Sequence, residues 1–283
     1  MERCELSAGH GPDDACQEET AMQIHHGDIG DNGQLQEVVA RLLAPPTLEG
    51  IERALFIQPH PDDNQIGAGG IMAALAADGV EVYELTVCDD RFADPQYIGK
   101  ENSVRTIRQR ETLAAQKTLG ARDAGFLGFA DKTHATVDEI ADAIVPVIRR
   151  IRPQVVFTVD PALENECHSD HIKVGQAVKK SIMDAPFVFY PSFIDGHLHE
   201  DAWQVSILGL YFTDRPNTTI DISEVYAKKQ EAILCHRSQM SEELLMLLKV
   251  QDQVIAQRCG CPAAERVKLL SAHQLHCFPF PVE

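Results

Sequence analysis

Basic residues are scarce in this sequence. Its 25 lysines and arginines stand against 43 aspartates and glutamates, which gives a formal net charge of −18. Such a charge repels the phosphate backbone of nucleic acids and the anionic surface of membranes. We therefore expect neither nucleic acid nor a membrane among the partners of this chain.

Long apolar runs and closely spaced cysteines are missing as well. No stretch reaches the roughly 18 apolar residues that a transmembrane helix needs, and residues 1–20 lack the basic and apolar segments of a secretory signal peptide. Eight cysteines are scattered over 283 residues, without the density of a disulfide framework. These absences predict a cytoplasmic protein whose thiols are reduced.

The polar residues 1–32 show no periodic apolar pattern, which predicts a loose N-terminal extension. Residues 33–283 contain neither an internal repeat nor a low-complexity linker, so we expect a single domain there. In that domain strand-like apolar runs alternate with helical patterns. Strands are expected at 54–58, 81–87 and 154–159, and helices at 34–43, 66–78, 101–119, 136–151 and 171–184.

This alternation favours an α/β fold, in which a mostly parallel sheet is covered by helices on both faces. The pattern then becomes richer in strands, and we interpret this later part as a small C-terminal elaboration. Its expected strands are 187–190, 205–212 and 218–222, and its expected helices are 223–235 and 241–257. No clear pattern follows from residue 259 onward.

The segment PHPDDN (59–64) directly follows the first expected strand, at the end of a strand where ligand sites form in α/β sheets. Its prolines stiffen a loop that carries one imidazole and two carboxylates, which are zinc-ligand types. His60 and Asp63 are the candidate metal ligands, and Asp62 is the candidate general base. An alternative is an Asx-type turn in which Asp63 or Asn64 caps the next helix and His60 has no role.

Three glycines follow this loop at Gly67, Gly69 and Gly70. A dinucleotide-binding fingerprint that starts at Gly67 needs glycine at position 72, where the chain has Met72. An alternative function for this chain is that of a Rossmann-type nucleotide-binding oxidoreductase. The broken glycine pattern argues against it. The glycines instead predict a helix start that packs closely against the sheet.

A second cluster, ECHSDH (166–171), lies beyond the strand expected at 154–159. Catalytic zinc typically takes three protein ligands and leaves a fourth position to water, so His171 is the candidate third ligand. His168 is placed to hold a developing oxyanion or to protonate a leaving amine, and Asp170 to orient a histidine. The alternative is a pair of surface histidines at a helix start that Ser169 or Asp170 caps.

With both clusters in place, the chain resembles the LmbE-like, or PIG-L, family of N-acetylglucosaminyl deacetylases. The resemblance rests on PHPDD (59–63), GAGG (67–70), RQRETLAAQKTLG (108–120), HSDH (168–171) and KKQEAILCHRSQ (228–239). Only the pairing of PHPDD with HSDH is specific. Two departures are Asn64, where the family often has glutamate, and Ser169, where it usually has proline; neither affects a candidate ligand.

The resemblance implies a Rossmann-like three-layer α/β/α sandwich that often assembles into homo-oligomers. It implies one zinc ion, or another divalent metal, per chain, with the ligand and base roles given above. It adds Arg108 as a substrate contact. The implied reaction is removal of an N-acetyl group from an N-acetylglucosamine-type sugar or a small conjugate of one, and the alternative is an amidase for a thiol conjugate or another N-acyl substrate. Aromatic residues make up only 6% of the chain, which favours a small substrate over a long polysaccharide.

The end of the chain carries further metal-binding side chains at Cys259, Cys261, His273, His276 and Cys277. They suggest a second, structural zinc, although the Cys-x-Cys spacing is tighter than the usual zinc pattern. Their role stays open, as does that of residues 1–32.

Overall fold

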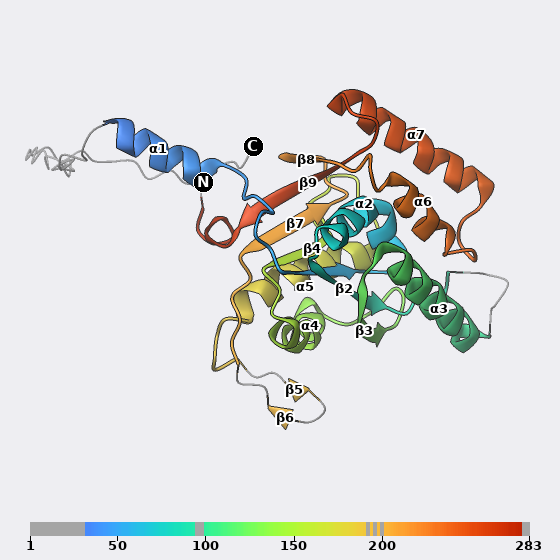
Figure 1. Cartoon of the computed structure of the whole chain (residues 1–283). Coiled ribbons are helices and arrows are strands. Elements are labelled where there is room, and N and C mark those ends of the chain that lie inside the picture. Colours follow the sequence, from blue (N-terminus) through green and yellow to red (C-terminus); the bar gives the residue numbers. More distant parts are fainter. Residues whose placement is uncertain (1–31, 94–98, 191–192, 195–196, 199–200, 279–283) are drawn as a thin grey trace, which may run out of the picture. The chain divides into compact units, whose positions relative to one another are not determined.

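The computed structural model describes residues 32–93, 99–190, 193–194, 197–198 and 201–278 (Figure 1). Contacts group the chain into Met1–Leu42 and Leu43–Glu283, and each part is described by itself. The first part contains most of helix α1 (Asn32–Leu43), which agrees with the helix expected at 34–43. Residues 1–31 lie outside the described residues, so the domain boundary expected after residue 32 stays a prediction.

One sheet in the second part has the strand order β3-β2-β1-β4-β7-β9-β8. Its strands are β1 (Arg53–Gln58), β2 (Glu81–Cys88), β3 (Arg122–Phe129), β4 (Val155–Val159), β7 (Ile207–Tyr211), β8 (Thr218–Asp221) and β9 (Ala264–Ser271). The strands from β3 to β7 pair in parallel, and β9 pairs antiparallel with both β7 and β8. The short strands β5 (Phe193–Ile194) and β6 (His197–Leu198) form a separate pair. The expected mostly parallel sheet is confirmed.

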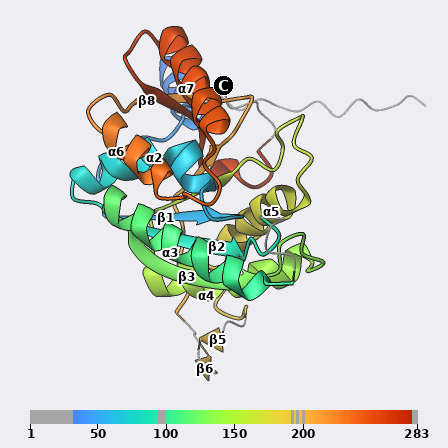
Figure 2. The same ribbon diagram turned by 90° about the vertical axis from the view of Figure 1, so that its right-hand side faces the viewer.

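Helices cover both faces of this sheet (Figures 1 and 2). They are α2 (Asp63–Ala77), α3 (Glu101–Leu119), α4 (Val137–Ile151), α5 (Ser169–Asp184), α6 (Tyr226–Leu234) and α7 (Glu242–Cys259). In β1, Leu55 and Ile57 join the core formed with α4 and α5, whereas Ala54 and Phe56 join the core formed with α2, α3 and α6. Successive side chains of a strand point to opposite faces, so one buried strand serves both cores and produces the three-layer sandwich.

The β1–β4 pair positions the candidate site. From β1 the chain continues outward to β2 and β3 and then returns to β4 on the other side of β1. In open α/β sheets such a reversal of strand order leaves a crevice at the carboxyl ends of the strands. The loop with His60 follows β1, and the segment leading to His168 follows β4. No helix in the described ranges is long and apolar enough to cross a membrane.

Helix α2 is broken close to the site, at Ala68 (φ −147°, ψ 17°). The amide groups exposed by the break donate to a carboxylate from the far end of the chain. Gly70 N lies 2.9 Å from Glu265 Oε1, and Ile71 N lies 2.8 Å from Glu265 Oε2. Lys229 Nζ lies 3.0 Å from Glu265 Oε1 and offsets its buried charge. Strand β9 thus caps the second half of α2.

The strand expected at 187–190 is wrong, because these residues form a turn after α5. The buried guanidinium of Arg149 donates to the carbonyl of Phe187 at 2.7 Å and to that of Tyr190 at 2.9 Å. These bonds hold the main chain in the turn, and the side chain of Phe189 is 99% exposed. An apolar run therefore marks an exposed turn here and not a buried strand.

Strands β3 and β9 were not predicted. In β3, Gly125 and Gly128 have positive φ angles of 115° and 75°, and the register with β2 shifts at two places. The glycines and shifts obscure the alternating pattern that predicts a strand. Strand β9 lies in the region that showed no clear pattern. Because β8 and β9 extend the central sheet, the expected C-terminal elaboration is built onto the same sheet as the preceding strands.

Candidate active site and metal centre

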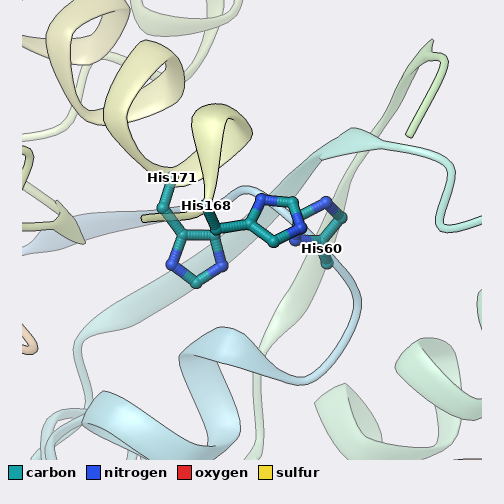
Figure 3. Close-up of side chains that lie close together, drawn as sticks. All are labelled: His60, His168 and His171. Atoms are coloured by element: carbon teal, nitrogen blue, oxygen red, sulfur yellow. The ribbon is translucent and has the colours of Figure 1, made fainter. Parts of the chain in front are cut away.

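Three histidines from two distant segments meet at the carboxyl end of the sheet (Figure 3). His60 lies in the loop between β1 and α2, whereas His168 and His171 belong to the first turn of α5. The ring centroid of His60 lies 4.7 Å from that of His168 and 5.4 Å from that of His171. The two candidate clusters therefore form one site.

Asp63 lies between two of these imidazoles. Its Oδ1 is 3.4 Å from His171 Nε2, and its Oδ2 is 3.7 Å from His60 Nδ1. The two separations involve different oxygens of Asp63, so its carboxylate links the two imidazoles, and the side-chain types of His60, Asp63 and His171 are ones that zinc accepts.

The outer nitrogen of each imidazole faces another carboxylate. His60 Nε2 lies 3.2 Å from Asp170 Oδ2 and 3.4 Å from Asp131 Oδ1. His171 Nδ1 lies 3.0 Å from Glu166 Oε2, a close contact that lacks hydrogen-bond geometry. Metal-binding histidines commonly have this arrangement, in which a carboxylate fixes the tautomer and orients the ring. His60 has this arrangement through its hydrogen bond with Asp170, which leaves its Nδ1 as the atom that could bind a metal.

Among the described residues, two groups of side chains bring one donor atom each to within 4.8 Å of one another: His60 with His168 and His171, and His60 with Asp131, His168 and Asp170. Asp63 belongs to neither group. In the second group Asp170 already accepts the main-chain N–H groups of Lys132 at 2.7 Å and Thr133 at 3.1 Å. Asp170 is completely buried. This carboxylate is therefore better placed to orient His60 than to bind a metal itself.

His60 and Asp63 each stabilise the charged form of the other. Burial disfavours the charged form of His60, but hydrogen bonds with Asp131, Asp170 and Asp63 outweigh it and raise the pKa of this imidazole well above its ordinary value. Burial likewise opposes ionisation of Asp63, but His171 and His60 overcome it and lower the pKa of the Asp63 carboxyl. The site thus stabilises Asp63 as a carboxylate, the form that binds metals.

Asp62 has a left-handed backbone, with φ 104° and ψ −23°, which is uncommon for a residue other than glycine. Its Oδ2 accepts a 2.8 Å hydrogen bond from Arg108 Nη2. Burial raises the pKa of the Asp62 carboxyl to about 7, with a further contribution from the charge of Asp63, while Arg108 opposes the shift. The side chain of Asp62 thus contacts Arg108, whereas that of Asp63 contacts His60 and His171. The pKa of the Asp62 carboxyl is raised and that of the Asp63 carboxyl is lowered.

The capping alternative for the first cluster accounts for only part of this loop. Asp62 occupies the N-cap position of α2, but its side chain makes no capping hydrogen bond. Asp63 Oδ2 accepts the main-chain N–H of His60, three residues earlier, at 2.8 Å, which resembles the return bond of a capping box and not an Asx turn. This bond fixes Asp63 against His60, so the turn and the metal geometry coexist.

At the second cluster the cap of α5 is His168 itself and neither Ser169 nor Asp170. Its Nδ1 accepts the main-chain N–H of Asp170 at 3.3 Å. Burial, with the nearby His60 and His171, lowers the pKa of His168. A neutral ring that accepts at Nδ1 carries its proton on Nε2. His168 thus offers an N–H donor beside the imidazoles of His60 and His171.

Arg108 is 1% exposed and holds acidic residues together. Its Nε lies 2.6 Å from Asp90 Oδ2, its Nη1 lies 2.7 Å from Glu111 Oε2, and its Nη2 contacts Asp62 Oδ2 and the carbonyl of Pro61. The structure thus places Arg108 beside the candidate base. The substrate contact implied for it stays a prediction.

Sequence patterns missed two of the residues that support the site and left the role of a third open. Asp131 follows β3, the strand that the pattern did not predict. Glu166 lies inside ECHSDH, where its acidic side chain next to a histidine pair was the available signal. For His236, within KKQEAILCHRSQ, the sequence leaves two roles open: a residue that faces the pocket, or an imidazole favoured at a helix C-terminus. The structure places its Nδ1 3.4 Å from Arg108 Nη1.

The cysteines and histidines near the end of the chain are not brought together. Cys259 and Cys261 precede β9, whereas His273, His276 and Cys277 follow it. This strand has eight residues and spans about 26 Å at 3.3 Å per residue. The hypothesis of a second zinc site formed by all five residues is therefore wrong for this arrangement.

A cavity of about 420 Å³ lies between α2, α6, α7 and β9. Its lining includes Ile66, Phe212, Ile233, Val254 and the buried Lys229. None of the histidines and aspartates described above lines it. This cavity adjoins helix α2, which begins at Asp63, but it is distinct from the candidate site.

Comparisons with known proteins identify one family and several related deacetylases. The family model for PIG-L, described as GlcNAc-PI de-N-acetylase, matches residues 55–182. The diacetylchitobiose deacetylase of Thermococcus kodakarensis is 31% identical over 238 residues, which cover 81% of this chain and 87% of that protein. A probable N-acetyl-α-D-glucosaminyl L-malate deacetylase 2 of Bacillus cereus is 31% identical over 208 residues, covering 70% and 90%.

Among solved structures, N,N′-diacetylchitobiose deacetylase from Pyrococcus horikoshii superposes with a TM-score of 0.78 at 24% identity. The match covers 89% of this chain and 98% of that one, which establishes a common fold. The identity to the curated relatives, extending over most of both chains, shows that the protein belongs to the PIG-L family of GlcNAc-PI de-N-acetylases.

Proposed function

We propose that this protein is a zinc-dependent N-deacetylase that removes an acetyl group from an N-acetylglucosamine-type sugar or a small conjugate of one. The observation that carries the proposal is the position of Asp63 between His60 and His171, with Asp62 next to it. This arrangement combines a set of metal ligands with a separate carboxylate able to take a proton. The deacetylase names of the relatives supply the substrate class.

His60, Asp63 and His171 are the proposed ligands of one zinc ion, because their side-chain types suit zinc and the Asp63 carboxylate contacts both imidazoles. Zinc bound there would polarise the amide carbonyl and lower the pKa of a water molecule. Asp170, Asp131 and Glu166 would hold the two imidazoles in orientation.

Asp62 is the proposed general base, which removes a proton from the attacking water. Its carboxylate lies next to the ligand Asp63 in the chain and is held by Arg108. As the water oxygen attacks the amide carbon, the carbonyl oxygen gains negative charge. The Nε2–H of His168 would donate a hydrogen bond to this oxygen.

Collapse of the intermediate breaks the carbon–nitrogen bond. The proton taken up by Asp62, or one from His168, passes to the departing nitrogen, so that acetate and a free amine are formed. Homo-oligomer formation, a cytoplasmic location and the absence of nucleic-acid partners remain predictions. A small substrate is proposed in keeping with the aromatic content of 6%.

The test begins with metal analysis of the purified protein. Acetate release is then measured from a panel of N-acetylated sugars, including diacetylchitobiose and N-acetylglucosaminyl malate, with and without a chelator. The proposal predicts release that stops with chelator and returns with zinc. Hydrolysis of thiol-conjugate amides alone would favour the amidase alternative, and a zinc-loaded protein that deacetylates nothing on the panel would overturn the proposed function.

A further inference from the structure

His236 lies in the turn that follows α6, and its side chain is 0% exposed. Its Nδ1 is 3.4 Å from Arg108 Nη1, on helix α3. An arginine guanidinium has only N–H donors and no acceptor, so Nδ1 must accept this hydrogen bond. His236 is therefore neutral and carries its proton on Nε2. Burial and the charge of Arg108 favour the same form, since they lower the pKa of His236 to about 3.

The turn with His236 is tied to the helix that carries Arg108. Ser238 N and Ser238 Oγ each lie 2.7 Å from an oxygen of Glu111. Glu111 Oε2 in turn accepts from Arg108 Nη1 at 2.7 Å. The second N–H of Nη1 is shared between His236 Nδ1 and Ser238 Oγ, which is 3.5 Å away. One side of the guanidinium is thus enclosed by Glu111 and the turn.

The opposite side of the same guanidinium holds the candidate base. Arg108 Nη2 donates to Asp62 Oδ2 at 2.8 Å and to the carbonyl of Pro61, and Nε donates to Asp90. All five N–H groups of Arg108 are therefore used within the protein. Because the guanidinium is planar and rigid, any rotation that changes the direction of Nη1 also moves Nη2 relative to Asp62.

We propose that His236 is a positioning residue for the catalytic base. As a neutral acceptor it completes the hydrogen bonding of Arg108 Nη1 and so fixes the guanidinium that holds Asp62. The role of Asp62 as base rests on the proposed function, whereas the coupling of His236 to the Asp62–Arg108 geometry does not. His236 acts through Arg108 without contacting the substrate, and its Nε2 has no hydrogen-bond partner within the described part of the chain.

Three substitutions of His236 distinguish its role as a hydrogen-bond acceptor for Arg108 from a role in packing alone. In His236→Asn the amide oxygen reaches the position of Nδ1 and keeps an acceptor for Arg108. In His236→Gln the amide reaches the position of Nε2, and His236→Leu removes both polar atoms. We expect kcat to fall roughly 10- to 100-fold in the Leu and Gln variants, because displacement of a catalytic group by about 1 Å has such effects. The Asn variant should regain most of this loss.

The same variants are compared by crystal structure, metal content and KM. We expect His236→Leu to lengthen or break the Asp62–Arg108 contact of 2.8 Å, His236→Asn to preserve it, and metal content and KM to stay near the wild-type values. Retention of that contact in His236→Leu overturns the proposal whatever the activity. Rescue by Gln and not by Asn also overturns it, because Nε2 would then be the functional atom. If the contact responds as expected but wild-type protein deacetylates nothing, the positioning stands and the proposed function fails.

Discussion

Asp62 and Asp63 are consecutive residues whose carboxylates have different partners. Asp62 Oδ2 lies 2.8 Å from Arg108 Nη2, whereas Asp63 Oδ1 lies 3.4 Å from His171 Nε2. The left-handed backbone of Asp62, with φ 104°, turns the two side chains apart. A single residue in an uncommon conformation thus allows one short loop to supply both the proposed metal ligand and the proposed base.

Replacing the base should abolish most of the activity without removing the metal. We predict that Asp62→Asn lowers kcat by roughly 10²- to 10⁴-fold, the usual contribution of general-base catalysis. The asparagine side chain has nearly the same size but cannot accept the proton of the attacking water. Steady-state kinetics of acetate release measure the effect. Zinc content close to that of the wild type distinguishes this loss from damage to the metal site.

Replacing the neighbouring carboxylate gives the matched control. Asp63→Asn should lose metal as well as activity, because Asp63 lies between His60 and His171. Equal metal content in the two asparagine variants would contradict the division of roles between Asp62 and Asp63.

Metal affinity should depend on Glu166 as well as on His171. His171→Ala removes a proposed ligand, so we predict that the protein is purified with little zinc. Glu166→Gln keeps every ligand but removes the carboxylate 3.0 Å from His171 Nδ1. Loss of such an outer partner typically weakens metal binding by about 10- to 100-fold. Competition with a chromogenic chelator measures both affinities, and an unchanged affinity in Glu166→Gln would show that Glu166 does not orient His171.

The buried Glu84 should make stability depend on pH. Its carboxyl accepts hydrogen bonds from Gln58, Gln65 and Gln116 at 3.0, 2.7 and 3.3 Å, and burial raises its pKa from 4.5 to about 7. The folded state therefore binds the proton more tightly than the unfolded chain does. The stabilisation from this proton is complete below the unfolded pKa and is lost as the pH rises through about 7.

Glu84→Gln imitates the protonated side chain and does not titrate. Urea unfolding should therefore show the variant gaining stability relative to the wild type between pH 5 and pH 9, by an amount on the order of 1–3 kcal/mol. A constant difference across this pH range would mean that Glu84 ionises equally easily in both states.

Two adjacent glycines of α2 should respond differently to alanine. A Cβ atom at Gly70 would lie 2.5 Å from Ile222 Cδ1, whereas one at Gly69 would meet Lys229 Cγ at 3.4 Å. We predict that Gly70→Ala destabilises the protein by about 1–3 kcal/mol through overpacking. Gly69→Ala should be neutral or stabilising, because alanine favours a helix by up to about 1 kcal/mol over glycine. Denaturant unfolding of the two variants tests this contrast, and equal effects would contradict it.

The location of the site was predictable because local patterns determine it. The apolar runs before His60 and before the ECHSDH segment mark β1 and β4, and metal-binding side chains follow both strands. Parallel strands bring such segments to one edge of a sheet. The expectation that His60 and His171 share a site followed from this topology, and their ring centroids lie 5.4 Å apart.

The residues that hold the candidate ligands and base in place could not be predicted from local sequence patterns. Asp131 follows β3, whose glycines with positive φ hide the strand pattern. The contact of His236 with Arg108 joins a turn after α6 to helix α3, and no local spacing encodes such a tertiary contact. The left-handed φ of Asp62 carries no signal either, since this conformation is usually associated with glycine.

The carboxylate of Glu265, in strand β9, accepts hydrogen bonds from the main-chain N–H groups of Gly70 and Ile71 in helix α2. A protein shortened before Ala264 would keep all the histidines and aspartates of the metal cluster and would look complete by its motifs. It would nevertheless leave two main-chain donors of α2 without their acceptor and the buried Lys229 without one of its two carboxylate partners. Intact motifs are therefore an insufficient guide when homologous fragments are chosen for expression.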